Sequence, residues 1–179
     1  MQLDCVIAGF GGQGILLMGK ILAQAAMGEG LQTTFLPSYG PEMRGGTANC
    51  SVVIADTLIA SPVVDMMDVL VALNQQSYDK FLPRMRGGGL LLINESLVHT
   101  RAPEEKQLRV CGGGLTDIAG ALGDVRFASM VALGCFVRAT GIVPLDAVAQ
   151  AMRELTAKRP ELHAQNESAL QRGFALAQL

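Results

Sequence analysis

The chain has 179 residues, of which half are hydrophobic and 17 % are charged, and its formal net charge at pH 7 is −2. This length fits one domain over residues 1–179 with a sizeable core. The near-neutral charge, the lack of a long basic run and the lack of Trp argue against nucleic-acid binding. No uncharged apolar stretch is long enough to span a bilayer and no signal peptide is recognisable, so we expect a cytoplasmic protein. The low charged fraction fits either a compact α/β domain with a large core or a surface partly covered by partner subunits.

None of the four cysteines belongs to a C-x-x-C pair. They are Cys5, Cys50, Cys111 and Cys135. We expect them as small buried hydrophobic residues in a reducing compartment, three in strands and Cys135 in a helix. The two histidines, His99 and His163, lie far apart and belong to no ligand pattern. The sequence therefore predicts no zinc or iron–sulfur site on this chain.

The first part of the chain predicts a βαβ unit. An apolar strand at residues 3–9 leads through glycines into a helix at 14–27, and a second strand follows at 31–36. Residues 37–46, PSYGPEMRGG, contain two Pro and three Gly and predict a loop.

The rest of the chain alternates strands with helices. Strand 47–55 is followed by a possible turn and a return strand at 58–61, which predicts an antiparallel hairpin near 47–60. Further strands are expected at 68–74, 90–94 and 108–112, and helices at 77–85, 115–122, 126–140, 145–157 and 161–178. This alternation predicts an α/β fold: a three-layer α/β/α sandwich with a mostly parallel, Rossmann-like sheet and an antiparallel hairpin.

Residues 7–16, IAGFGGQGIL, have the Gly9-x-Gly11-x-x-Gly14 spacing of a dinucleotide fingerprint. A glycine turn between a strand and a helix presents backbone N–H groups to an anion. Dinucleotide binding also requires an acidic residue about 20 positions further on, at the end of the second strand. That strand ends TTFLPSYG, without an acid or an Arg, which argues against NAD or NADP. Gln13 stands at the helix start, where it could bond a ligand or a neighbouring loop, or cap its own helix.

The loop Ser38–Gly46 follows the second strand, so we expect it at the same sheet edge as the glycine turn. Glycines around Arg44 permit a close backbone approach, and Arg44 supplies a fixed cation that could also pair with Glu42. No nucleophile–base pair is recognisable in the sequence. The chain is therefore not expected to be a catalyst alone.

Seven segments together resemble the gamma subunit of 2-oxoacid:ferredoxin oxidoreductases. They are GFGGQGILLMGKILAQAA, PSYGPEMRGGTANCSVVIAD, IASPVVD, VLVALNQQSYDKF, GGGLLLINESLV, SMVALGCFVRATG and KRPELHAQNESALQRG. They occur in this order over essentially the whole chain. The motifs G-x-G-G-Q-G and S-Y-G-P-E-M-R-G-G are specific in combination.

The resemblance implies a multisubunit enzyme of anaerobic metabolism that converts a 2-oxoacid and coenzyme A (CoA) to acyl-CoA and CO2 while ferredoxin is reduced. Thiamine diphosphate would lie between the alpha and beta subunits. The [4Fe-4S] clusters would lie on other chains, including a ferredoxin-like delta subunit. This chain would then be a subunit that binds no cofactor by itself, beside the active-site cavity and the access route of CoA.

The resemblance carries over to twelve residues in two motifs. The first comprises Gly9, Gly11, Gly12, Gln13 and Gly14, and the second comprises Tyr39, Gly40, Pro41, Glu42, Arg44, Gly45 and Gly46. We expect both loops to form an intersubunit surface near the cofactor and CoA. Arg44 would meet an anionic group there, either a phosphate or a partner carboxylate.

The SYGPEMRGG form resembles the 2-oxoglutarate and branched-chain types, and we favour 2-oxoglutarate. A branched-chain or pyruvate type is the alternative. Ser129 stands where the family pattern N-M-V-x-L-G leads us to expect Asn, a departure that affects one hydrogen bond. From other classes, a stand-alone nucleotide-binding module and a structural homodimer remain as hypotheses.

Overall fold

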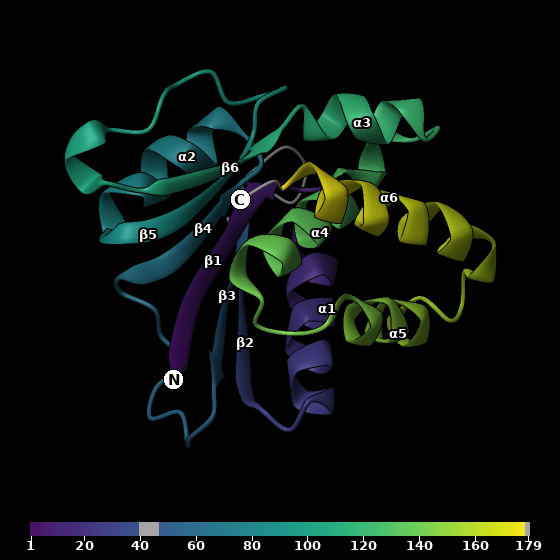
Figure 1. Cartoon of the computed structure of the whole chain (residues 1–179), viewed down its shortest axis with the longest axis horizontal. Coiled ribbons are helices and arrows are strands. Elements are labelled where there is room, and N and C mark those ends of the chain that lie inside the picture. The colour runs from purple at the N-terminus through teal and green to yellow at the C-terminus, as the bar shows by residue number, and fades with distance from the viewer. Residues whose placement is uncertain (40–46, 178–179) are drawn as a thin grey trace.

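One six-stranded sheet organises the chain, with the strand order β2-β3-β1-β4-β5-β6 (Figure 1). The computed structural model describes residues 1–39 and 47–177. The strands are β1 (Gln2–Phe10), β2 (Gln32–Tyr39), β3 (Thr47–Ala55), β4 (Met67–Ala72), β5 (Met85–Asn94) and β6 (Arg109–Gly113). The α-helices are α1 (Ile15–Gly28), α2 (Gln75–Phe81), α3 (Leu115–Ala121), α4 (Ala128–Thr140), α5 (Leu145–Leu155) and α6 (His163–Leu176).

The α/β class and the mostly parallel sheet are confirmed. The β1–β4, β4–β5 and β5–β6 pairs are parallel, whereas β3 pairs antiparallel with both β1 and β2. The central strands read as continuous apolar runs because both of their faces are covered, as in β1, where six consecutive residues are buried.

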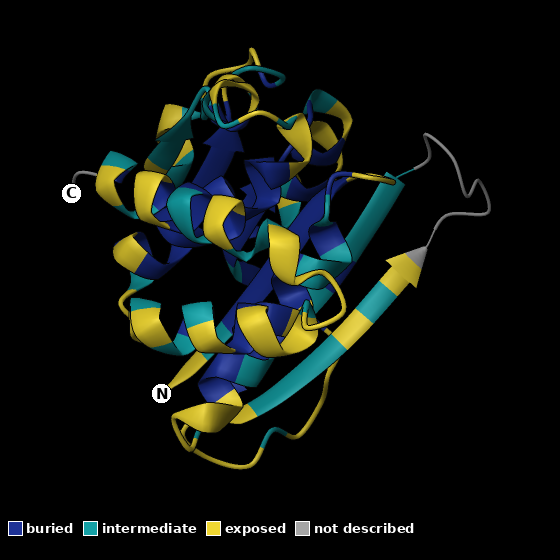
Figure 2. Ribbon diagram, turned by 90° about the vertical axis from the view of Figure 1, so that its right-hand side faces the viewer, coloured by how far each residue is buried: buried dark blue, intermediate teal, exposed yellow. Residues whose placement is uncertain are grey.

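The predicted hairpin near 47–60 is wrong in its position. Residues 58–61 form no strand, and the antiparallel partner of β3 on its outer side is β2, which precedes it in the chain. β3 therefore lies between β2 and β1, and β2 becomes the edge strand with intermediate and exposed residues (Figure 2). The apolar pattern of the sequence identified β3, but which strand pairs with β3 depends on contacts between residues far apart in the chain.

Helices cover the two faces of the sheet unequally. One face, which includes Ile7, Val52 and Val71, packs against α1, α4, α5 and α6 in the larger core. The opposite face packs against the short helix α2 through Tyr78 and Phe81. This is the predicted three-layer arrangement. The expected helix at 77–85 is shorter than predicted, because Leu82–Arg84 form a 3-10 turn and β5 begins at Met85.

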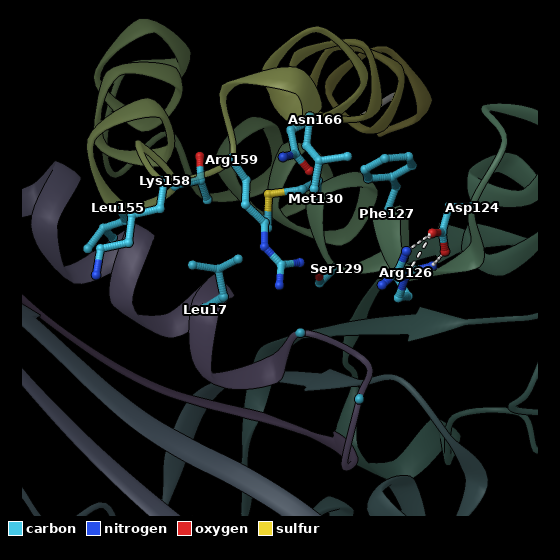
Figure 3. Close-up of a pocket in the computed structure, with 14 residues that line it drawn as sticks. Leu17, Asp124, Arg126, Phe127, Ser129, Met130, Leu155, Lys158, Arg159 and Asn166 are labelled. Atoms are coloured by element: carbon cyan, nitrogen blue, oxygen red, sulfur yellow. Dashed lines mark hydrogen bonds and ion pairs between the residues drawn. The ribbon is translucent and has the colours of Figure 1, made fainter.

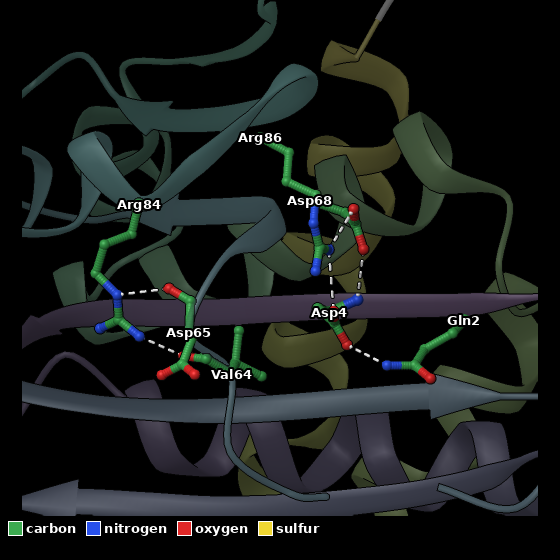
Figure 4. Close-up of polar contacts among 7 residues, drawn as sticks. All are labelled: Gln2, Asp4, Val64, Asp65, Asp68, Arg84 and Arg86. Atoms are coloured by element: carbon green, nitrogen blue, oxygen red, sulfur yellow. Dashed lines mark hydrogen bonds and ion pairs between the residues drawn. The ribbon is translucent and has the colours of Figure 1, made fainter. Parts of the chain in front are cut away.

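Hydrogen-bonded ion pairs hold the amino ends of the parallel strands together (Figure 4). Nη1 of Arg86 lies 3.0 Å from Oδ2 of Asp4 and 2.7 Å from Oδ1 of Asp68, and the other Asp68 oxygen accepts the Asp4 N–H at 2.9 Å. Arg84 donates to the backbone carbonyls of Val64 and Asp65 and so fixes the crossover into β4. Charged side chains thus connect the strands at this edge of the sheet, whereas the glycine turn lies at the opposite, carboxyl edge.

No helix among the described residues is long and apolar enough to cross a membrane.

Two glycines set the distance between α4 and α6. A Cβ on Gly173 would lie 1.8 Å from the carbonyl oxygen of Val131, and a Cβ on Gly134 would lie 2.0 Å from that of Leu170. Both obstacles are backbone atoms, so a larger residue forces the helices apart.

We therefore expect Gly173→Ala to lower the free energy of unfolding by about 1–3 kcal/mol or more, because the added methyl overpacks a helix crossing. Gly28→Ala is the matched control, since its Cβ meets nothing within 4 Å at the exposed end of α1. Urea denaturation of both variants measures the difference. Equal midpoints would show that the crossing adapts to the methyl group.

Candidate functional site

The two predicted loops leave the same edge of the sheet. Gly9 of β1 and Tyr39 of β2 both pair with Ala48, which lies near the start of β3. β1 and β2 run in the same direction, so their carboxyl ends lie side by side with β3 between them, about 10 Å apart. β2 ends at Tyr39, so residues 37–39, which the sequence predicted as loop, belong to the strand. Gly40, Pro41, Glu42, Arg44, Gly45 and Gly46 lie outside the described residues.

The side chain of Gln13 is turned inward. Its Oε1 accepts the Phe10 N–H at 2.9 Å, its Nε2 donates to the Leu73 carbonyl at 3.3 Å, and only 9 % of the residue is exposed. Of the three roles considered for Gln13, helix capping is wrong, because Gly14 is the N-cap of α1 and no side chain caps this helix. Gln13 instead bridges the end of β1 and the residue after β4.

Three of the four glycines of the turn, Gly9, Gly12 and Gly14, are explained by contacts and backbone angles. A Cβ on Gly9 would lie 2.3 Å from Oε1 of Gln13, so the inward glutamine requires a glycine there. Gly12 and Gly14 have positive φ angles of 100° and 77°. In that region, residues with a side chain are strained, which makes glycine the fitting residue.

Asn94 is a polar residue of this edge that the sequence did not identify. It is fully buried at the end of β5, and its Nδ2 donates to the Leu73 carbonyl at 3.3 Å and to Oγ1 of Thr116 at 2.8 Å. Asn94 Oδ1 accepts the Thr116 N–H at 3.2 Å. The Leu73 carbonyl is thus shared by two buried amides, one on each side of β4. An Asn directly after a buried apolar run was the available signal.

Ser129 lies against the glycine turn. A Cβ on Gly14 would lie 2.5 Å from the hydroxyl oxygen of Ser129, which is the second residue of α4. The departure from the family pattern therefore falls at the contact between the turn and α4.

A pocket of about 380 Å³ opens beside the turn (Figure 3). The turn and α1 contribute Gly12, Gly14 and Leu17, and the start of α4 contributes Phe127, Ser129 and Met130. The remaining wall comes from Asp124, Arg126, Leu155, Thr156, Lys158, Arg159, Leu162 and Asn166. Of these residues, only the two glycines and Ser129 were singled out from the sequence. The lining residues come together because α4, α5 and α6 pack against one another, and a local sequence pattern does not predict that packing.

The four cysteines have the burial expected of structural thiols. Cys5, Cys50 and Cys135 are buried, and Cys111 is partly buried. Burial raises the pKa of Cys50 and of Cys135 to about 12, and that of Cys111 to about 11. These thiols stay protonated at neutral pH, whereas metal ligation requires thiolates. Among the described residues, no group of three His, Cys, Asp or Glu side chains is arranged to hold a metal ion.

Replacement of Gln13 by Leu tests the bridge. The variant removes both hydrogen bonds and leaves the Phe10 N–H without an acceptor and the Leu73 carbonyl with one donor fewer, which we expect to cost about 1–3 kcal/mol of unfolding free energy. Gln150→Leu is the control, because Gln150 is exposed on α5 and bonds only Glu154. Chemical denaturation gives both values. A Gln13 variant as stable as the control would contradict the bridging role.

Comparisons with known proteins agree with this architecture. Residues 4–176 match the family model for pyruvate ferredoxin/flavodoxin oxidoreductase. The ketoisovalerate oxidoreductase subunit VorA of Methanothermobacter thermautotrophicus is 46 % identical over 78 % of this chain, which spans only 28 % of that relative. The 2-oxoglutarate synthase subunit KorC of Methanocaldococcus jannaschii is 35 % identical over 99 % of this chain and 95 % of its own.

Solved structures show the same fold. The gamma subunit of a keto/oxoacid ferredoxin oxidoreductase from Geobacter sulfurreducens superposes with a TM-score of 0.86 at 32 % identity, over 99 % of this chain and 97 % of that one. A 2-oxoglutarate:ferredoxin oxidoreductase from Magnetococcus marinus, solved with 2-oxoglutarate, coenzyme A and succinyl-CoA, gives a TM-score of 0.89 at 24 % identity, over 98 % of this chain and 31 % of that one. The chain belongs to the pyruvate ferredoxin/flavodoxin oxidoreductase family.

Proposed function

We propose that the chain, as one domain over residues 1–179, is the gamma subunit of a multisubunit 2-oxoacid:ferredoxin oxidoreductase that acts on 2-oxoglutarate. The observation that carries this proposal is the near end-to-end match to KorC, which covers 99 % of this chain and 95 % of that relative. A match of this extent supports a separate subunit of the same kind. The complex would convert 2-oxoglutarate and CoA to succinyl-CoA and CO2 while ferredoxin is reduced.

A branched-chain 2-oxoacid is the second candidate substrate. The identity to VorA is higher, at 46 %, than the identity to KorC. This chain spans only 28 % of VorA, however, so the match to VorA covers one portion of a longer chain. The difference in chain organisation favours 2-oxoglutarate over the branched-chain alternative.

The proposed partners carry the redox and carbon chemistry. They are the alpha and beta subunits with thiamine diphosphate between them, a ferredoxin-like delta subunit with [4Fe-4S] clusters, and ferredoxin. The described part of this chain does not fit a cluster, because its cysteines are protonated and come from β1, β3, β6 and α4. We therefore derive no electron-transfer step through this chain.

The role proposed for this chain is to form part of the CoA approach. The glycine turn and the end of β2 lie at the carboxyl edge of the sheet, and the pocket lies beside Gly14 of that turn. The positive end of α1 faces this region, and its first turn contains no acidic residue. Such a surface suits the phosphates of CoA, which is the anionic reactant of the proposed reaction.

The first experiment purifies the chain with its partners from the native cell. We expect 2-oxoglutarate to reduce a viologen dye in the presence of CoA, with kcat/KM at least about tenfold above those for 2-oxoisovalerate and pyruvate, and no activity from this chain alone. A preference for 2-oxoisovalerate would move the assignment to the branched-chain type. Activity of the isolated chain, or its purification as a homodimer without partners, would reject the subunit role.

A second prediction concerns Arg44, which follows the end of β2 in sequence. We expect Arg44→Ala to leave assembly intact and to raise the KM for CoA about 10- to 100-fold, the effect of losing one charge-assisted hydrogen bond. Steady-state viologen assays on the purified complex measure it. If the variant complex assembles with an unchanged KM for CoA, the role of Arg44 is refuted.

A further inference from the structure

Two segments that resemble the family, and for which no ligand contact has been assigned, meet the glycine turn at one pocket. Ser129 belongs to SMVALGCFVRATG, and Arg159 and Asn166 belong to KRPELHAQNESALQRG. In the fold they line the same cavity of about 380 Å³ as Gly12 and Gly14 of the glycine turn. Residues more than a hundred positions apart thus share one wall, with α1 below, α4 behind and the start of α6 above (Figure 3).

Two polar side chains in this wall belong to buried residues and make no hydrogen bond with the described part of the chain. Asn166 is 7 % exposed and Ser129 is 2 % exposed. Within residues 1–39 and 47–177, neither side chain makes a hydrogen bond, although both line the pocket. A buried amide without a partner is costly, and the donors and acceptors of a ligand would satisfy it.

The cations around the pocket differ in how they are neutralised. Arg126 is held by Asp124, with 2.5 Å between Nη2 and the carboxylate and a second bond from Nε at 2.7 Å. The hydrogen bond from Arg126 lowers the pKa of Asp124. Arg159 makes no ion pair with any described residue, and its guanidinium reaches down between Leu17 and Ser129. Lys158 also lines the pocket without an ion pair to a described residue, but the Arg159 guanidinium is the cation that lies between Leu17 and Ser129 (Figure 3).

The remaining surface limits the class of ligand. The start of α1, whose N-cap Gly14 provides no side chain, adds partial positive charge from its free N–H groups. Leu17, Phe127, Met130 and Leu162 give one apolar side. The combination fits a molecule with a phosphate group at one end and a flat or apolar part beside it, and the volume lies in the range of small-ligand sites.

We propose that Arg159 is the residue of this chain that determines recognition of a phosphate ester in the pocket, with the Asn166 amide and the Ser129 hydroxyl as hydrogen-bonding partners. Arg126 does not contact the ligand, because Asp124 neutralises it. This inference rests on the proposed function, in which CoA is the phosphate ester. It assigns the contact to the α5–α6 connection and α4, beyond the two loops predicted from the sequence.

The test compares Arg159→Gln with Arg126→Gln in the purified complex. Both variants remove one positive charge from an exposed position around the same pocket. We expect Arg159→Gln to raise the KM for CoA at least tenfold with kcat within twofold, and Arg126→Gln to change the KM less than threefold. Arg153→Gln, which removes an exposed arginine paired with Glu167 outside the pocket, controls for net charge.

A binding measurement separates this inference from the proposed function. Isothermal titration of the full-length chain with CoA should show at least tenfold weaker binding for Arg159→Gln and for Asn166→Leu, with unchanged urea midpoints. If the complex oxidises 2-oxoglutarate but Arg159→Gln keeps the wild-type KM, the inference is wrong and the function stands. If the complex lacks this activity, weaker CoA binding by the variants still supports the site. Equal binding by all forms, or none by the wild type, refutes it.

Discussion

The site depends on one buried peptide group, that of Leu73, directly after β4. Its N–H donates to the Ala8 carbonyl at 2.9 Å, and its carbonyl accepts from Gln13 and Asn94, each at 3.3 Å. The ends of β1, β4 and β5 are therefore fixed to a single point. Because Gln13 also accepts the Phe10 N–H, the turn into α1 cannot move independently of the sheet. Gly9 makes this possible, since a side chain there would occupy the place of the Gln13 oxygen.

This anchoring has an electrostatic consequence. Gln13, which precedes α1, makes its side-chain hydrogen bonds inside the fold. The N-cap of the helix is Gly14, and the first turn contains no acidic residue. The positive end of α1 is consequently left uncompensated toward the pocket. The opposite edge of the sheet is built differently, because Arg86 there is compensated by Asp4 and Asp68. At one edge, internal ion pairs stabilise the strands; at the other, under the proposed function, the positive end of α1 faces the phosphates of CoA.

The sequence predicted the elements well and the contacts between them poorly. Apolar runs and glycine spacing identified β1, α1 and β4 because those signals are local. The strand predicted to pair with β3 was the wrong one, since strand pairing depends on residues distant in the chain. The glycine motif was located correctly, but a sequence cannot show that Gln13 turns inward. Arg159 and Asn166 were quoted only as part of a resemblance, and their position beside Gly14 follows from the tight α4–α6 crossing at Gly134 and Gly173.

Relatives named for different 2-oxoacids share this domain, and that limits what its pocket can recognise. VorA is named for ketoisovalerate and KorC for 2-oxoglutarate, yet both match most of this chain. One of these acids carries a branched apolar chain and the other a second carboxylate, so a pocket selective for either would differ between the two types. Under the proposed function, CoA is the reactant that both reactions have in common. A pocket with one unpaired arginine, a helix N-terminus and an apolar wall suits that shared reactant, and the choice of 2-oxoacid then belongs to the partner subunits.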